Sequence, residues 1–123
     1  MHALVIDDSR TVRAIIGKTL RDEGFTVSEA GDGRAGLAAL AGTPDVGLVL
    51  VDWNMPEMDG LAFITAVRAD RAYDGVRVVM VTTETEQVQV GRALAAGADE
   101  YVMKPFTREI LVAKLSLLGV FGE

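Results

Sequence analysis

The chain lacks cysteine and carries a single histidine, His2, beside its N-terminus. Without cysteine it has no disulfide, no thiolate metal site and no cysteine nucleophile. A lone terminal histidine is typical of solvated surface, which argues against zinc sites built from several histidines and against hydrolysis centred on a histidine. The chemistry of this chain must therefore come from other side chains.

Basic residues and long apolar runs are also scarce. The chain has 12 lysines and arginines against 18 aspartates and glutamates, a net charge of −6, whereas nucleic acid binding needs a concentrated basic face. No apolar run approaches the roughly 20 residues of a membrane span, and the N-terminus shows no signal-peptide core. We therefore expect a monomeric, cytoplasmic protein that binds neither nucleic acid nor membrane.

What the sequence does contain is an alternation of apolar runs with helical patterns, within the 123 residues of one domain. The apolar runs predict strands at 3–7, 25–30, 46–52, 76–82 and 100–103. The helical spacing of apolar residues predicts helices at 9–24, 33–42, 60–72, 85–97 and 107–119. We expect one domain over 1–123, with no attached effector domain.

The apolar spacing also predicts which side of two helices faces the core. In helix 9–24 the expected core-facing residues are Val12, Ile15, Ile16, Thr19 and Leu20. In helix 107–119 they are Ile110, Leu111, Lys114 and Leu118.

Five strand–helix units predict an α/β fold with a parallel sheet whose two faces are covered by helices. The runs at 46–52 and 76–82 are apolar throughout and belong in the sheet interior, whereas FTVSEA (25–30) alternates and suggests an edge strand. This predicts the flavodoxin-like strand order 2-1-3-4-5, with the functional site beyond the carboxyl ends of strands one and three.

Polar side chains gather at those strand ends. Asp7 and Asp8 close the first strand and Asp52 closes the third, while Thr82 and Lys104 lie at the ends of the fourth and fifth. Three adjacent carboxylates repel one another unless a divalent cation binds, and an all-oxygen site favours Mg²⁺, or Mn²⁺, over zinc. With an ammonium and a hydroxyl beside it, the cluster predicts a phosphoryl site in which Asp52 is the nucleophile. Taken singly, strand-end acids are helix caps more often than catalysts, and Asp8, Ser9 and Asp59 are the candidate caps.

The motifs VIDDS (5–9), VDWNMPEMDG (51–60), VTTETE (81–86) and YVMKPF (101–106) together resemble a response-regulator receiver domain over the whole chain. This resemblance implies that Asp52 accepts a phosphoryl group from a histidine kinase or phosphotransfer domain. It implies that Mg²⁺ is held by Asp7, Asp8, Asp52 and the backbone carbonyl of Asn54, and that Thr82 and Lys104 bind the phosphoryl oxygens. It also implies a cis bond before Pro105 and a loop turn at Gly60.

The resemblance further implies a signalling phosphoprotein rather than an enzyme, one that catalyses its own phosphorylation and dephosphorylation. Thr82 and Tyr101 are its implied switch residues, and Asn54 and Glu84 its implied tuners of dephosphorylation. The trio Asn54, Glu84 and Tyr101 resembles that of chemotaxis regulators that signal to the flagellar motor switch. The expected output face comprises Val90, Tyr101, Met103, Phe106 and Lys114.

The sequence leaves several alternatives open. The first helix carries Arg10, Arg13 and Ile16, which form either a kinase-docking surface or an ordinary solvated helix. GDGRAG (31–36) has the spacing of a dinucleotide-binding loop, but it follows the predicted edge strand rather than a central one. A small Mg²⁺-dependent phosphohydrolase, a receiver-like scaffold without chemistry, and a phosphorelay intermediate or phosphate sink outside chemotaxis are the other candidates.

Overall fold

The computed structural model describes residues 1–83 and 89–120. Its strands are β1 (His2–Ile6), β2 (Thr26–Ala30), β3 (Val46–Asp52), β4 (Arg77–Thr83) and β5 (Glu100–Lys104). Its helices are α1 (Arg10–Asp22), α2 (Gly33–Gly42), α3 (Gly60–Arg68), α4 (Val90–Ala96) and α5 (Arg108–Leu117), with a short 3-10 helix η1 (Arg71–Tyr73) before β4.

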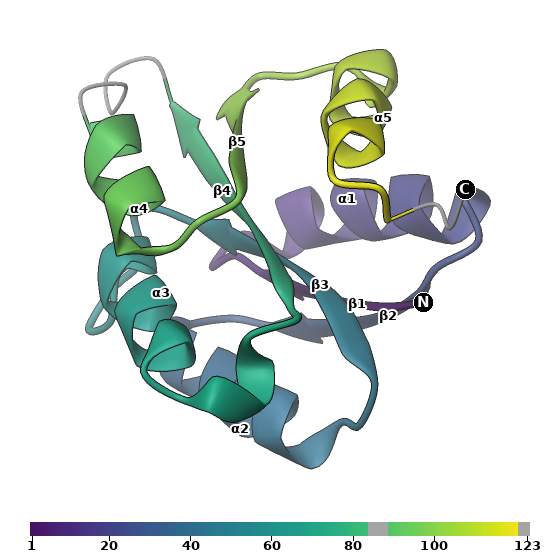
Figure 1. Cartoon of the computed structure of the whole chain (residues 1–123). Helices are drawn as coiled ribbons and strands as arrows, with labels where there is room; N and C mark the ends of the chain where they lie inside the picture. The colour runs from purple at the N-terminus through teal and green to yellow at the C-terminus, as the bar shows by residue number, and fades with distance from the viewer. Residues whose placement is uncertain (84–88, 121–123) are drawn as a thin grey trace.

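All strand pairs are parallel, and the sheet order is β2-β1-β3-β4-β5. The predicted fold class and the edge position of the second strand are therefore confirmed. Figure 1 shows α1 and α5 on one face of the sheet and α2, α3 and α4 on the other. Within the described residues, no helix is long and apolar enough to cross a membrane.

Each central strand contributes side chains to two separate hydrophobic cores, because successive side chains point to opposite faces of the sheet. In β1, Leu4 and Ile6 pack beneath α2 and α3, whereas Ala3 and Val5 pack beneath α1 and α5. All four are buried, which explains why the central strands are apolar without alternation.

The buried faces of α1 and α5 differ from the prediction. Ile15 is 59% exposed and Ile110 is 48% exposed. Buried pairs four residues apart, Ile16 with Leu20 and Leu111 with Leu115, define the inward faces instead. Ile15 and Ile110 each precede such a pair by one residue, about 100° around the helix, so they point away from the core.

The third and fourth predicted helices differ most from the observed bounds, whereas the first and fifth differ by one or two residues at each end. The third ends at Arg68, because Asp70 caps η1 by accepting a hydrogen bond from the backbone N–H of Ala72. The fourth spans Val90–Ala96 among the described residues and ends before Gly97, whose φ is 120°. Residues 85–88 of that prediction lie outside the described residues.

The glycines of GDGRAG serve helix packing. Asp32 caps α2 by accepting a hydrogen bond from the backbone N–H of Ala35 at 2.8 Å. A Cβ at Gly36 would overlap the Ile6 side chain and lie 3.2 Å from Phe63 Cε1, and one at Gly33 would lie 2.8 Å from Met58 Cγ. The loop follows the edge strand β2, so the structure supports the packing interpretation over a dinucleotide site.

Gly36→Ala is expected to lower the free energy of unfolding by about 1–3 kcal/mol, because the added methyl must displace Ile6 and Phe63 from a filled core. Gly42→Ala is the matched control: it lies in the same helix, a Cβ there meets nothing within 4 Å, and we expect a gain of about 0.5–1 kcal/mol. Urea denaturation measures both, and a Gly36→Ala protein as stable as the wild type would contradict the packing argument.

Candidate functional site

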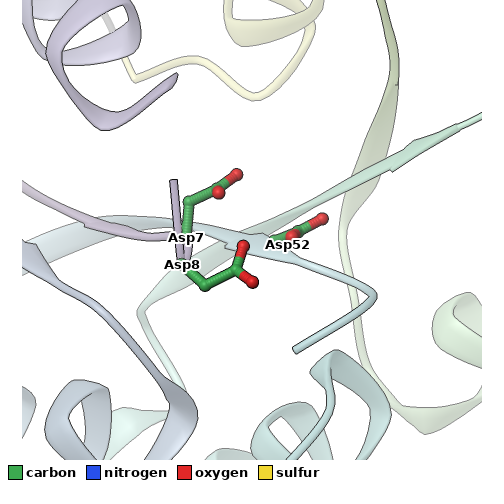
Figure 2. Close-up of side chains that lie close together, drawn as sticks. All are labelled: Asp7, Asp8 and Asp52. Atoms are coloured by element: carbon green, nitrogen blue, oxygen red, sulfur yellow. The ribbon is translucent and has the colours of Figure 1, made fainter. Parts of the chain in front are cut away.

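Three carboxylates meet where the order of the sheet reverses. Asp7 and Asp8 directly follow β1, and Asp52 is the last residue of the neighbouring β3. One oxygen from each lies within 4.8 Å of the others, and Figure 2 shows the three side chains side by side. Asp7 is 2% exposed and Asp52 6% exposed, whereas Asp8 is open to solvent. The cluster is thus a buried pair with one exposed member at its mouth.

The segment after β1 is held by a dense set of hydrogen bonds. The Asp7 N–H donates to the Ala30 carbonyl at 3.1 Å, and Asp7 Oδ1 accepts from the Ser9 N–H at 2.8 Å. Ser9 caps α1, its hydroxyl accepting from the Val12 N–H at 3.2 Å. Asp8 therefore does not cap this helix, and its carboxylate remains available to a ligand. Asp59, by contrast, caps α3 as the capping interpretation expected.

Lys104 reaches this cluster from the end of β5. Its Nζ lies 3.0 Å from Asp7 Oδ2 and 3.4 Å from Asp52 Oδ1. Burial lowers the pKa of the Lys104 ammonium, but the hydrogen bond that it donates to Asp7 and the charges of Asp52 and Asp7 together raise the pKa above its ordinary value. The following bond to Pro105 is cis, as the resemblance implied.

Asp52 is the perturbed acid of the cluster. Burial, and then the charge of Asp7, raise the pKa of its carboxyl to about 6, against the lowering effects of Lys104 and of the Asn54 N–H. The raised pKa measures how unfavourable the negative charge is in this pocket. A divalent cation relieves such repulsion directly.

Asp52→Asn should stabilise the metal-free protein at neutral pH by up to about 3 kcal/mol, because an acid whose folded pKa lies above its unfolded pKa penalises the folded state once it ionises. The penalty is small near the ordinary pKa of 3.8, grows as the pH rises and is complete above the folded pKa of about 6. Urea unfolding in chelator at about pH 5 and pH 7.5 measures it. Mg²⁺ should reduce the difference in unfolding free energy between Asp52→Asn and the wild type. If that difference does not change with pH, ionisation of Asp52 is not its cause.

Thr82 and Tyr101 occupy neighbouring strands beside this pocket. Thr82 is fully buried in β4, one residue past Val81, the register partner of Asp52, and its hydroxyl donates to the Thr83 carbonyl at 3.4 Å. Tyr101 in β5 is half-buried, with Lys114 Nζ 4.1 Å from its ring centroid. Lys114 also pairs with Glu100 at 3.4 Å, so Tyr101 lies beneath a positioned ammonium.

The expected output face is divided by the structure. Tyr101, Met103 and Lys114 line one shallow pocket, and Val90 begins α4. Phe106 lies elsewhere: it packs against the core beneath α1 and α5 and lines a groove with Ile15.

The expected docking and tuning residues have mixed outcomes. Ile16 is 1% exposed, so it is unavailable to a partner, whereas Arg10 is exposed. Asn54 is exposed, and its backbone N–H helps to lower the pKa of the Asp52 carboxyl. Glu84 lies outside the described residues.

The sequence did not predict that Arg13 turns inward to the Asp7 carbonyl, although its place in the first turn after the acidic pair was a usable signal.

The donor set fits a hard divalent cation. Its three side chains offer only carboxylate oxygens, and the exposure of Asp8 leaves room for the water ligands that Mg²⁺ retains. Zinc prefers nitrogen and sulfur donors, and the sequence has no cysteine and only one histidine. Mg²⁺ or Mn²⁺ is therefore the cation that these residues suit.

Comparison with known proteins is consistent across sequence and structure. A sequence model of the response regulator receiver domain matches residues 3–116. The chain is 44% identical over 116 residues to a chemotaxis protein CheY homolog of Campylobacter jejuni, covering 94% of this chain and 89% of that protein. It is 41% identical over 119 residues to chemotaxis protein CheY1 of Helicobacter pylori, covering 96% of each.

Solved structures show the same likeness. Chemotaxis protein CheY4 of Vibrio cholerae superposes with a TM-score of 0.87 at 35% identity, covering 94% of this chain and 96% of that one. A putative two-component response regulator with a GGDEF domain superposes with a TM-score of 0.92 at 31% identity, covering the whole of this chain and 51% of that one.

Proposed function

Because this chain belongs to the family of response regulator receiver domains and is a chemotaxis response regulator, we propose that it signals through a phosphoryl group carried on Asp52. The observation that carries this proposal is the Asp52 carboxylate itself. It is buried at the switch point, its pKa is raised to about 6, and it lies between two further carboxylates and an ammonium.

Asp7, Asp8, Asp52 and the backbone carbonyl of Asn54 would hold Mg²⁺ in this proposal. When bound, the cation would offset the negative charge of the phosphoryl oxygens. The chain's own part is to supply these oxygens from two adjacent strand ends, with Asp7 fixed by Ser9 and Lys104.

The proposed transfer makes one bond and breaks one. An Asp52 carboxylate oxygen attacks the phosphorus of a phosphohistidine on a histidine kinase or phosphotransfer domain. The new O–P bond is an acyl phosphate, and the broken N–P bond leaves the histidine nitrogen to take up a proton. Lys104 Nζ and the Thr82 hydroxyl would receive the phosphoryl oxygens, since both lie at the strand ends that border Asp52.

Output is proposed to pass through the surface that contains Tyr101, Met103 and Lys114, with Val90 at its edge. Thr82 and Tyr101 lie on adjacent strands, so movement of Thr82 toward the phosphoryl group gives the Tyr101 ring a new packing. The proposed partner is a flagellar motor-switch protein. In this scheme the chain acts as a stand-alone monomeric receiver in the cytoplasm.

The proposal is tested by incubating the protein with acetyl phosphate and Mg²⁺ and recording its intact mass. The wild type should gain one acid-stable, base-labile phosphoryl group, and Asp52→Asn should gain none. Asp59→Asn is the matched control, because the Asp59 side chain caps α3 by accepting from the Ala62 N–H and is not a member of the carboxylate cluster, and it should be phosphorylated like the wild type. A wild-type protein that gains no phosphoryl group would overturn the proposal.

The output partner needs a separate measurement. Titration of a labelled N-terminal peptide of a flagellar motor-switch protein should show tighter binding to the protein treated with beryllofluoride and Mg²⁺ than to the untreated protein. Phosphorylation without any change in peptide affinity would favour the phosphorelay intermediate or phosphate sink over the chemotaxis output.

A further inference from the structure

Arg13 is an inward-turned cation in the first turns of α1. Its side chain is only 16% exposed although it belongs to a surface helix. Its Nη1 donates to the carbonyl oxygen of Asp7 at 2.5 Å, and its Nε donates to Glu29 Oε1 at 3.1 Å. Arg13 therefore joins the segment after β1 to the edge strand β2.

The Asp7 carbonyl belongs to the peptide group that links Asp7 to Asp8. The N–H on the other side of Asp7 is already fixed by the Ala30 carbonyl, and the Asp7 carboxylate is fixed by Ser9 and Lys104. Arg13 supplies the remaining constraint, because it fixes the plane of the Asp7–Asp8 peptide.

Asp8 depends on that constraint more than Asp7 does. Within the described part of the chain, no hydrogen bond or ion pair holds the exposed Asp8 carboxylate. Its direction toward Asp7 and Asp52 thus follows from the backbone that carries it. A rotation of the Asp7–Asp8 peptide would move the Asp8 carboxylate out of the 4.8 Å cluster.

The role of Arg13 differs from that of Lys104. Lys104 contacts two carboxylates of the cluster directly, whereas the Arg13 guanidinium is paired with Glu29 and meets only a carbonyl of the cluster segment. A planar guanidinium that binds two acceptors at once fixes their relative orientation. Arg13 therefore acts by orienting the Asp7–Asp8 peptide, and it does not neutralise the carboxylates of the cluster.

We propose that Arg13 is a positioning residue for cation binding: by clamping the Asp7–Asp8 peptide to Glu29 of β2, it presents the Asp8 carboxylate to the ion shared with Asp7 and Asp52. This inference rests on the proposed function, because it concerns the Mg²⁺ site of the phosphorylation pocket. Partners that orient metal ligands in this way typically change metal affinity about 10- to 100-fold when removed.

The test compares Arg13→Met with Arg34→Met, which removes the same charge from an exposed residue at the start of α2. Mg²⁺ affinity is read from the fluorescence of Trp53, the single tryptophan, next to Asp52. Arg13→Met should weaken Mg²⁺ binding at least about tenfold. Loss of a positive charge alone acts in the opposite direction, so Arg34→Met should leave binding unchanged or tighten it up to about twofold.

A second readout separates positioning from general damage. The rate of phosphorylation by acetyl phosphate should need more Mg²⁺ for half-saturation in Arg13→Met, while the rate at saturating Mg²⁺ stays within about threefold of the wild type. Arg13→Lys should restore part of the affinity, because it keeps one donor but cannot bind both acceptors in one plane.

Mg²⁺ affinity in Arg13→Met equal to or tighter than that of the wild type would overturn the inference, as would a lowered saturated rate with unchanged affinity. If circular dichroism shows Arg13→Met to be unfolded, Arg13→Lys decides: weakened Mg²⁺ binding supports positioning, and wild-type binding overturns it. A wild-type protein that binds no Mg²⁺ contradicts the proposed function itself, so the two failures are distinct.

Discussion

Lys104→Met should slow phosphorylation of the protein by acetyl phosphate about 100- to 1,000-fold at saturating Mg²⁺. The Lys104 ammonium lies within 3.4 Å of the Asp52 carboxylate and is held in place by Asp7 at 3.0 Å. It is therefore oriented in advance toward the position where the charge of the transferring phosphoryl group develops, in a pocket that excludes much of the water. Methionine keeps the length of the side chain and removes only this charge and its donors.

The same substitution should have the opposite effect on cation binding. In the metal-free protein, Lys104 partly neutralises two buried carboxylates and so competes with Mg²⁺ for Asp7 and Asp52. Without it, Mg²⁺ binding should tighten by roughly tenfold. A slower reaction together with tighter metal binding is a combination that misfolding does not produce.

Lys18→Met is the matched control for both measurements. Lys18 is 77% exposed on α1 and, among the residues that the structure describes, pairs only with Asp22, so its loss should leave the phosphorylation rate and the Mg²⁺ affinity near their wild-type values. A Lys104→Met protein that is phosphorylated as fast as Lys18→Met would refute the role of the ammonium.

Phe63→Ala should lower the free energy of unfolding by about 3–5 kcal/mol, the largest stability effect that we expect from one substitution. Phe63 of α3 is fully buried. It packs in the same core as Ile6 of the sheet and lies next to Gly36 of α2. Removing the ring leaves a cavity at the point where these layers meet, and the glycine contact offers no side chain to refill it.

Leu117→Ala provides the comparison, because Leu117 is a large apolar residue of α5 that is 75% exposed. Its replacement should change the free energy of unfolding by no more than about 0.5 kcal/mol. Urea denaturation with equal m-values for the two variants measures the difference. Similar losses in both would mean that the core beneath α3 is not packed as described.

The cluster of Asp7, Asp8, Asp52 and Lys104 was predictable from the sequence because topology alone brings its members together. Once the apolar runs fix the strands and the half-polar run fixes the edge, Asp7, Asp52 and Lys104 must follow strands that end at one edge of the sheet. Their proximity can be predicted without knowledge of side-chain packing, because the carboxyl ends of parallel strands lie on the same side of the sheet.

Helix orientation was less predictable, because neighbouring apolar residues compete for the same face. Ile15 and Ile16 are equally apolar, yet only Ile16 is buried, since Gly17 and Leu20 set the rotation of α1 against the sheet. The packing of Phe106 against the core beneath α1 and α5 was hidden for a related reason: it depends on the path of the chain after Pro105. The inward turn of Arg13 depends on the Asp7 carbonyl as acceptor, so its position just after the acidic pair was a signal but its residue type was not.

The mixture of charges around Asp52 has a thermodynamic consequence. With its three carboxylates and one ammonium ionised, the pocket holds a net charge of two negatives, which a divalent cation would balance. An acyl phosphate on Asp52 replaces a monoanion by a group that carries more negative charge, so the balance is disturbed again. Linkage then requires reciprocity: whatever factor the cation adds to the stability of the phosphorylated state, phosphorylation adds to the affinity for the cation. In the proposed mechanism, the free Mg²⁺ concentration of the surroundings therefore enters the equilibrium between the unphosphorylated and the phosphorylated state.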